Sequence, residues 1–134
     1  MHKIKRHFSN APWESQVGYC RAVKAGDHIH VTGTAPIDEN GATYAPGDPY
    51  AQACRCFDLI RSTLRKFDAE LDCVVRTRMF VTNIKQWEAF GKAHKEYFGE
   101  HPPATTMVEI KALIDPAMMI EVEADAYVER SRDD

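Results

Sequence analysis

The sequence lacks any apolar run long enough to cross a membrane, and residues 1–7 lack the apolar core of a secretion signal. It also lacks internal repeats, low-complexity tracts and an interdomain linker. With 134 residues, 44% of them hydrophobic, the chain is long enough to bury one core. We therefore expect a single cytoplasmic domain over residues 1–134, with no membrane partner.

Concentrated positive charge is missing as well. The 17 lysines and arginines are scattered and the net charge is -3, so the sequence predicts no nucleic-acid partner. It has no glycine-rich phosphate loop and no serine–histidine–acid order, and we expect no cofactor. Only four cysteines are present (Cys20, Cys54, Cys56 and Cys73), and without a secretion signal reduced thiols are expected.

What the sequence does have is strong period-2 alternation near its C-terminus. In the segment Met119–Val128 the apolar residues occupy one face, and Glu121, Glu123 and Asp125 occupy the other. The segment Pro103–Leu113 also alternates. Because only a short link separates the two segments, we predict neighbouring antiparallel strands.

The rest of the chain predicts more strands and two helices. Lys3–Phe8 reads as a short edge strand, 9–14 as a loop, and Val17–Lys24 with His28–Thr34 as a hairpin turned at 25–27. A helix should start at Asp48-Pro49 and bury Ala53, Phe57, Ile60, Leu64 and Phe67. A strand is predicted over Cys73–Val81. A second helix, introduced by Asn83 and Gln86 and capped by Gly99, should place Trp87 and Phe90 in the core.

Two amphipathic helices cover only one side of such a sheet. The other side would carry a mixed set of residues, among them His30, Thr32, Thr105, Met107 and Glu121. Methionine on a purely solvated face is unusual, and a partner subunit against that face would account for it. The sequence thus predicts an α+β fold that associates with copies of itself.

Six segments resemble one known family. They are Ala11-Pro12, Gly18-Tyr19, the run from Val31 to Pro36, Met79-Phe80-Val81, and Pro103–Glu109 followed by Ile120–Ala124. In order and spacing they resemble the Rid family of imine and enamine deaminases, formerly called endoribonuclease L-PSP. The resemblance implies a chorismate-mutase-like fold with a six-stranded mixed sheet, two helices on one face, and a homotrimer with ligand clefts between subunits.

The resemblance also implies the site residues. The family's cleft glutamate corresponds to Glu121, expected as the catalytic residue, and its tyrosine to Tyr19. Thr32 stands at the family's strand serine, and Thr34 lies on the same predicted strand face. Where deaminases of the family have a carboxylate-binding arginine, this chain has Thr105, with Met107 two residues on. We expect Tyr19, Thr32, Thr34, Thr105 and Met107 to contact the substrate, which would lack the usual carboxylate.

Other residues suggest weaker alternatives. The carboxylates at 121, 123 and 125 share a face, but a solvated strand explains them more simply than a metal, and no metal is expected. Cys54 and Cys56 point apart on a helix and do not suit zinc. His28 and His30 share a strand face, where a structural role is commoner than catalysis. Arg76 or Arg78 is a candidate to replace the missing arginine.

Three functions remain open. In the first, Glu121 positions water to hydrolyse an imine, enamine or similar small compound. In the second, the intersubunit cleft binds a small metabolite without turnover. The third is ribonuclease activity, suggested by the older family name and disfavoured by the acidic charge balance.

Overall fold

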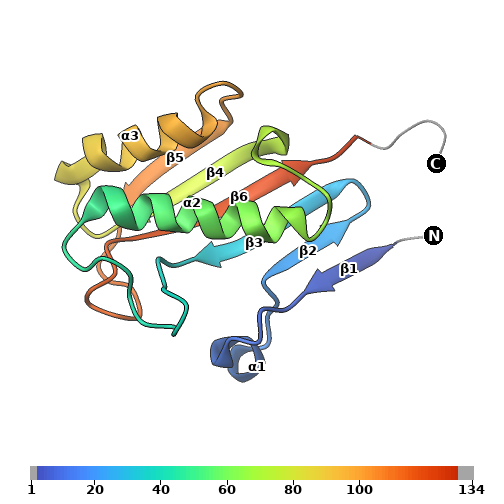
Figure 1. The fold of residues 1–134 in the computed structure, drawn as a ribbon, viewed down its shortest axis with the longest axis horizontal. Helices are drawn as coiled ribbons and strands as arrows, with labels where there is room; N and C mark the ends of the chain where they lie inside the picture. The colour runs from blue at the N-terminus through green and yellow to red at the C-terminus, as the bar shows by residue number, and fades with distance from the viewer. Residues whose placement is uncertain (1–2, 130–134) are drawn as a thin grey trace.

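The structure, a computed structural model, describes residues 3–129 and consists of a six-stranded sheet with two long helices packed on one face (Figure 1). The strands are β1 (Ile4–His7), β2 (Ala22–Ala25), β3 (His28–Thr34), β4 (Val74–Val81), β5 (Ala104–Glu109) and β6 (Ile120–Tyr127). The helices are α1 (Pro12–Val17), α2 (Pro49–Arg65) and α3 (Trp87–Phe98), with short 3-10 turns at Leu71–Cys73 and Ile84–Gln86. The predicted α+β fold is confirmed. The ends of the predicted domain, residues 1–2 and 130–134, lie outside the described residues.

The order of the strands corrects one prediction. The sheet runs β1-β2-β3-β6-β4-β5, and its neighbours are antiparallel except β4 and β5, which are parallel. The two C-terminal strands were expected to be antiparallel neighbours, and this is wrong. Instead β5 forms an edge, and β6 lies between β3 and β4.

The connection from β5 to β6 explains the error, because it crosses the end of β4 instead of turning back. Ile110 donates its backbone N–H to Val81, and Thr82 donates to Met119 on the other side of β4. Fully buried Gln52 of α2 fixes the crossing: its Nε2 donates to the Ala117 carbonyl at 2.9 Å, and its Oε1 accepts from the Met119 N–H at 2.8 Å. Alternation reports which face a side chain occupies, but not which strand lies alongside.

The first long helix forms as the sequence predicts. The Asp48 carboxylate accepts a hydrogen bond from the Ala51 N–H at 3.0 Å, and Pro49 opens α2. Ala53, Phe57, Ile60 and Leu64 are fully buried against the sheet. Phe67 lies beyond the end of the helix and is partly buried against the same core.

The alternation in β6 is also confirmed. Ile120, Val122, Ala124 and Ala126 are buried beneath α2 and α3, while the residues between them point to the opposite side. We call this opposite side the open face. It carries His28 and His30 from β3, Arg76, Arg78 and Phe80 from β4, and Glu121, Glu123 and Asp125 from β6.

Two local predictions are wrong. Segment 9–14 was expected to be a loop, but Pro12 begins α1, which ends at Gly18 in a left-handed conformation (φ 89°). The Glu14 carboxylate, only 4% exposed, accepts hydrogen bonds from the backbone and hydroxyl of Ser9 and holds this short helix in place. Trp87 was expected in the core, but it is 56% exposed because α3 buries Phe90, Ala93 and Phe98 instead.

Candidate functional site

Glu121 lies near the middle of the sheet, on the open face of β6, beside an irregularity in β3. The pairing of β3 with β6 shifts between Val31 and Thr34, which leaves Gly33 next to the glutamate. A Cβ atom on Gly33 would lie 3.0 Å from Glu121 Oε2 and 3.1 Å from its Cδ. Glycine therefore makes the space that the carboxylate occupies.

The same shift corrects the predicted position of Thr34. In a regular strand Thr34 would share the open face with Thr32, but the extra residue turns it to the helix side. Its side chain is 2% exposed, and its hydroxyl donates to the Thr32 carbonyl at 2.9 Å. Thr34 therefore stabilises the bulge that positions Gly33, and its expected place on the polar face was wrong.

The surroundings of Glu121 change its acidity. Burial raises the pKa of its carboxyl group, the positive charge of Arg21 opposes that rise, and the negative charge of Glu123 adds to it. The net effect is a raised pKa. Glu121 therefore keeps its proton to a higher pH than an ordinary glutamate.

Arg21 lies between Gly33 and the predicted tyrosine, and sequence reasoning missed it. Its Nη2 donates to the Gly33 carbonyl at 3.2 Å, and its guanidinium lies 5.9 Å from the centre of the Tyr19 ring. Tyr19 and Thr32 line one hollow of about 720 Å³. Two of the predicted contact residues thus lie together, whereas Glu121 does not line this hollow and is influenced by Arg21 only through its charge.

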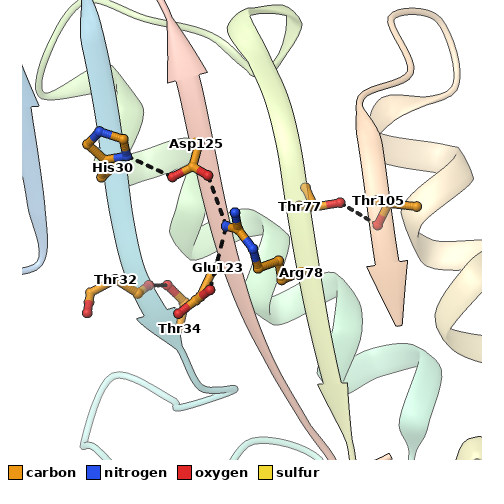
Figure 2. A network of polar contacts seen from close by, with 8 residues as sticks. All are labelled: His30, Thr32, Thr34, Thr77, Arg78, Thr105, Glu123 and Asp125. Carbon is orange, nitrogen blue, oxygen red and sulfur yellow. Dashed lines mark hydrogen bonds and ion pairs between the residues drawn. The ribbon is translucent and has the colours of Figure 1, made fainter. Parts of the chain in front are cut away.

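A second polar group occupies the open face beside this hollow (Figure 2). The Asp125 carboxylate is 2.8 Å from His30 Nδ1 and 2.9 Å from Arg78 Nη1, which also lies 3.7 Å from Glu123. Burial alone would raise the pKa of Asp125, but the hydrogen bonds from His30 and Arg78 outweigh it and hold the pKa below its usual value. Arg78, a candidate replacement for the missing arginine, is thus already paired.

Thr105 and Met107 lie on the other side of the sheet from Glu121, so the prediction that all three share the face opposite the helices is wrong. In the parallel pair β4–β5, Thr105 aligns with Thr77 and Met107 with Met79, both of which face the helices. The Thr77 hydroxyl is 2.7 Å from Thr105 Oγ1 and 2.8 Å from His94 Nε2 in α3. Within one chain, therefore, the structure does not bring Thr105 and Glu121 together.

The remaining candidates contribute no further site. In residues 3–129, no three histidine, cysteine, aspartate or glutamate side chains gather where they could hold a metal ion. The four cysteines lie in this range and form no disulfide. Burial raises the pKa of Cys56 well above the usual thiol value, so this group is not a reactive thiolate. None of the described helices is long and apolar enough to cross a membrane.

Comparison with known proteins fits this fold and chain order. The model of the family described as Endoribonuclease L-PSP matches residues 8–128. The chain belongs to this family. The Rid resemblance, which concerns the same family under its newer name, is thereby confirmed.

Relatives within the L-PSP family cover nearly the whole chain. An uncharacterized protein of Streptomyces coelicolor, SCO2049, is 35% identical over 92% of both chains. The 3-aminoacrylate deaminase RutC of Acinetobacter baylyi is 30% identical over 82% of this chain and 86% of its own.

Solved structures agree with the fold. The crystal structure of Rv2704 from Mycobacterium tuberculosis, described as a member of the YjgF/YER057c/UK114 family, has a TM-score of 0.85 and 39% identity, covering 94% of this chain and all of its own. A putative endoribonuclease of Thermotoga maritima has a TM-score of 0.80 and 28% identity, with 94% of each chain covered. The chorismate-mutase-like fold expected from the resemblance is thus confirmed.

Proposed function

We propose that this L-PSP family protein hydrolyses small imines or enamines that lack a carboxylate, at sites between copies of the chain, with Glu121 as the proton-transferring group. The observation that carries the proposal is the half-buried Glu121 carboxyl, whose pKa is raised and which lies against Gly33 on the open face. A relative described as a 3-aminoacrylate deaminase supports the reaction class, since 3-aminoacrylate is an enamine.

The reaction requires one group that both gives and takes a proton. Protonated Glu121 donates to the imine nitrogen, which makes the imine carbon electrophilic. The resulting carboxylate then accepts a proton from the attacking water, which leaves a carbinolamine. Glu121 next gives that proton to the amine nitrogen and takes the hydroxyl proton as the C–N bond breaks, which releases ammonia and leaves a carbonyl. An enamine instead takes the proton on carbon, which gives the same protonated imine that water attacks. Because the carboxyl is restored at the end, no cofactor is needed.

The proposed site lies between subunits because one chain does not assemble it. Glu121 is on the open face, whereas Thr105 is on the helix side of the edge strand β5. If a neighbouring copy presents its β5 edge to the open face, the two residues come together in one cleft. Closed rotational symmetry then repeats this contact in every subunit, as in the proposed homotrimer.

The substrate class follows from position 105. A guanidinium binds a carboxylate with two charge-assisted hydrogen bonds, whereas threonine offers one neutral hydroxyl. Loss of a charge-assisted contact costs about 1.5–3 kcal/mol, so carboxylate substrates should bind at least about tenfold more weakly.

We place the protein in the cytoplasm, where its four unpaired thiols suit reducing conditions.

The test is hydrolysis of imines with and without a carboxylate, generated in the assay from the corresponding amines or amino acids. Wild-type protein should accelerate hydrolysis of the uncharged imines, and Glu121→Gln should reduce that rate at least about 100-fold, in the range expected for loss of general acid–base catalysis. Glu88→Gln, at an exposed position of α3, is the matched control and should keep the full rate. No acceleration of any imine, or an unchanged rate in Glu121→Gln, contradicts the proposal.

A second candidate is a binding protein without turnover, and the threonine at position 105 favours it because the deaminases of this family keep arginine there. Ligand stabilisation in a thermal unfolding screen, with the ligand recovered unchanged, would support this alternative over catalysis.

The ribonuclease activity in the family's description is tested in the same preparation by incubation with RNA. Cleavage that survives in Glu121→Gln would assign it to another site.

A further inference from the structure

A chain of three hydrogen-bonding side chains runs through the helix side of the sheet to its edge. It begins at His94 in α3, passes through Thr77 of β4 and ends at Thr105 of β5, with separations of 2.8 Å and 2.7 Å between successive polar atoms. Figure 2 shows the last step, from Thr77 to Thr105 on the neighbouring strand. Thr105 is exposed, whereas Thr77 is fully buried, so the chain links an inaccessible interior to an accessible edge.

The interior end of this chain is held rigidly. The His94 ring packs 4.7 Å from the centre of the Phe98 ring and 5.6 Å from that of Phe57. Burial lowers the pKa of His94, so the ring is neutral at neutral pH and has one N–H. Since Thr77 is sealed from solvent, water does not compete for its hydroxyl.

The hydrogen bonds also have a direction. A threonine hydroxyl donates one hydrogen bond, and we assign that of Thr77 to Thr105 Oγ1. In this assignment Thr77 accepts from His94, so the N–H of the neutral ring is on Nε2. One lone pair of the Thr105 oxygen then accepts from Thr77, and the proton of Thr105 is free to point away from the sheet.

We propose that His94 and Thr77 are positioning residues that fix the Thr105 hydroxyl as a hydrogen-bond donor for an uncharged carbonyl or amide oxygen of the ligand. The inference rests on the proposed function, because it concerns the ligand of the same cleft. An uncharged acceptor loses little on leaving water and gains a full hydrogen bond. A carboxylate loses far more solvation than one neutral hydroxyl returns.

The test uses pyruvamide and pyruvate, which differ only in carrying a carboxamide or a carboxylate. Binding is measured by NMR titration of the labelled full-length protein, with the Thr105 amide as reporter. Wild-type protein should bind pyruvamide at least about tenfold more tightly than pyruvate. In Thr77→Val, which keeps the shape but removes the hydroxyl, the affinity for pyruvamide should fall about three- to tenfold, the size of one neutral hydrogen bond.

Two further variants separate positioning from general structural damage. Thr77→Ser keeps the hydroxyl and should restore the affinity for pyruvamide. Thr63→Val makes the same substitution at another buried threonine, in α2, and should leave the affinity unchanged. Equal binding of the two probes, no binding of either, or an unchanged affinity in folded Thr77→Val overturns the inference.

Failure of this inference is distinguishable from failure of the proposed function. If Glu121→Gln abolishes imine hydrolysis while Thr77→Val changes neither affinity nor probe preference, only the role of the His94–Thr77 pair is wrong. If no imine is hydrolysed, yet the preference for pyruvamide depends on the Thr77 hydroxyl, the binding inference stands and the catalytic proposal fails.

Discussion

Glu121 occupies the space that a side chain at Gly33 would fill, since a Cβ atom there would lie 3.0 Å from the carboxylate oxygen Oε2. That distance is shorter than ordinary van der Waals contact, so a side chain at residue 33 would require the carboxylate to shift by a few tenths of an ångström. The bulge in β3 and the carboxylate in β6 therefore form one structural unit.

Gly33→Ala tests this unit. The new methyl group should shift the Glu121 carboxylate by a few tenths of an ångström. Since displacement of a reacting group by about 1 Å costs about 100-fold in rate, we expect imine hydrolysis to fall about two- to tenfold in a steady-state assay, while the protein stays folded. Gly91→Ala in α3 is the control: no atom lies within 4 Å of its added Cβ, and alanine should stabilise the helix by roughly 0.5–1 kcal/mol. Equal activity in both variants would contradict the relationship.

The raised pKa of Glu121 predicts a pH dependence of stability. The native state binds the Glu121 proton more tightly than the unfolded state does, so the protonated group adds to the free energy of unfolding. This stabilisation is complete below the usual glutamate pKa of 4.5 and is lost as pH rises through the raised pKa of the native state. Urea unfolding of wild type and Glu121→Gln between pH 4 and 8 measures it. The stability of wild type relative to the variant should fall as pH rises above 4.5. A constant difference would mean that the pKa is not raised.

Thr105→Arg should restore the carboxylate-binding guanidinium that this chain lacks at position 105. A guanidinium at the edge of β5 supplies a charged, bidentate partner for carboxylates, worth about tenfold or more in affinity. We expect tighter binding of pyruvate and faster hydrolysis of imines that carry a carboxylate. Thr106→Arg adds the same charge one residue on, where the side chain points to the other face of the strand. If both variants gain equally, general attraction rather than position 105 explains the effect.

Gln52 should contribute strongly to stability through the crossing between β5 and β6. Gln52→Leu removes both of its close hydrogen bonds and leaves the partly buried Met119 N–H and Ala117 carbonyl without that partner. The expected cost is about 2–3 kcal/mol in the free energy of unfolding. Gln16→Leu, at an exposed position of α1, should change it by no more than about 0.5 kcal/mol. Similar costs in the two variants would show that Gln52 does not hold the crossing.

The sequence predicted the faces of this fold better than its connections. Helix α2 followed from Asp48, Pro49 and a regular apolar stripe, and the buried side of β6 followed from strict alternation. These signals are local, because each pattern is formed by residues that lie close together in the sequence. The place of β6 between β3 and β4 depends on Gln52, which lies more than 60 positions from the backbone groups it binds. No local pattern carries that information.

The same division applies to the candidate site. Glu121 was identified by its position in a resembling segment, and Tyr19 and Thr32 proved to line one hollow. Thr34 was placed on the wrong face because one extra residue in β3 reverses the alternation after Val31. Gly33, an isolated glycine in a strand, was the available signal for that bulge. Arg21 gave no such signal, since its contact with the Gly33 carbonyl depends on the pairing of β2 with β3.

The claim on which the account depends most is that each site combines Glu121 of one copy with Thr105 of another. Co-expression of Glu121→Gln with Thr105→Trp, whose large indole should block ligand entry, tests it most directly by the imine hydrolysis rate of the mixed oligomers, since each variant alone should be inactive. Random assembly should restore about a quarter of the wild-type sites, because a cleft between two different variants can combine both intact residues. Recovery of about a quarter of the wild-type rate is the predicted result. No recovery in mixed oligomers would contradict the shared site.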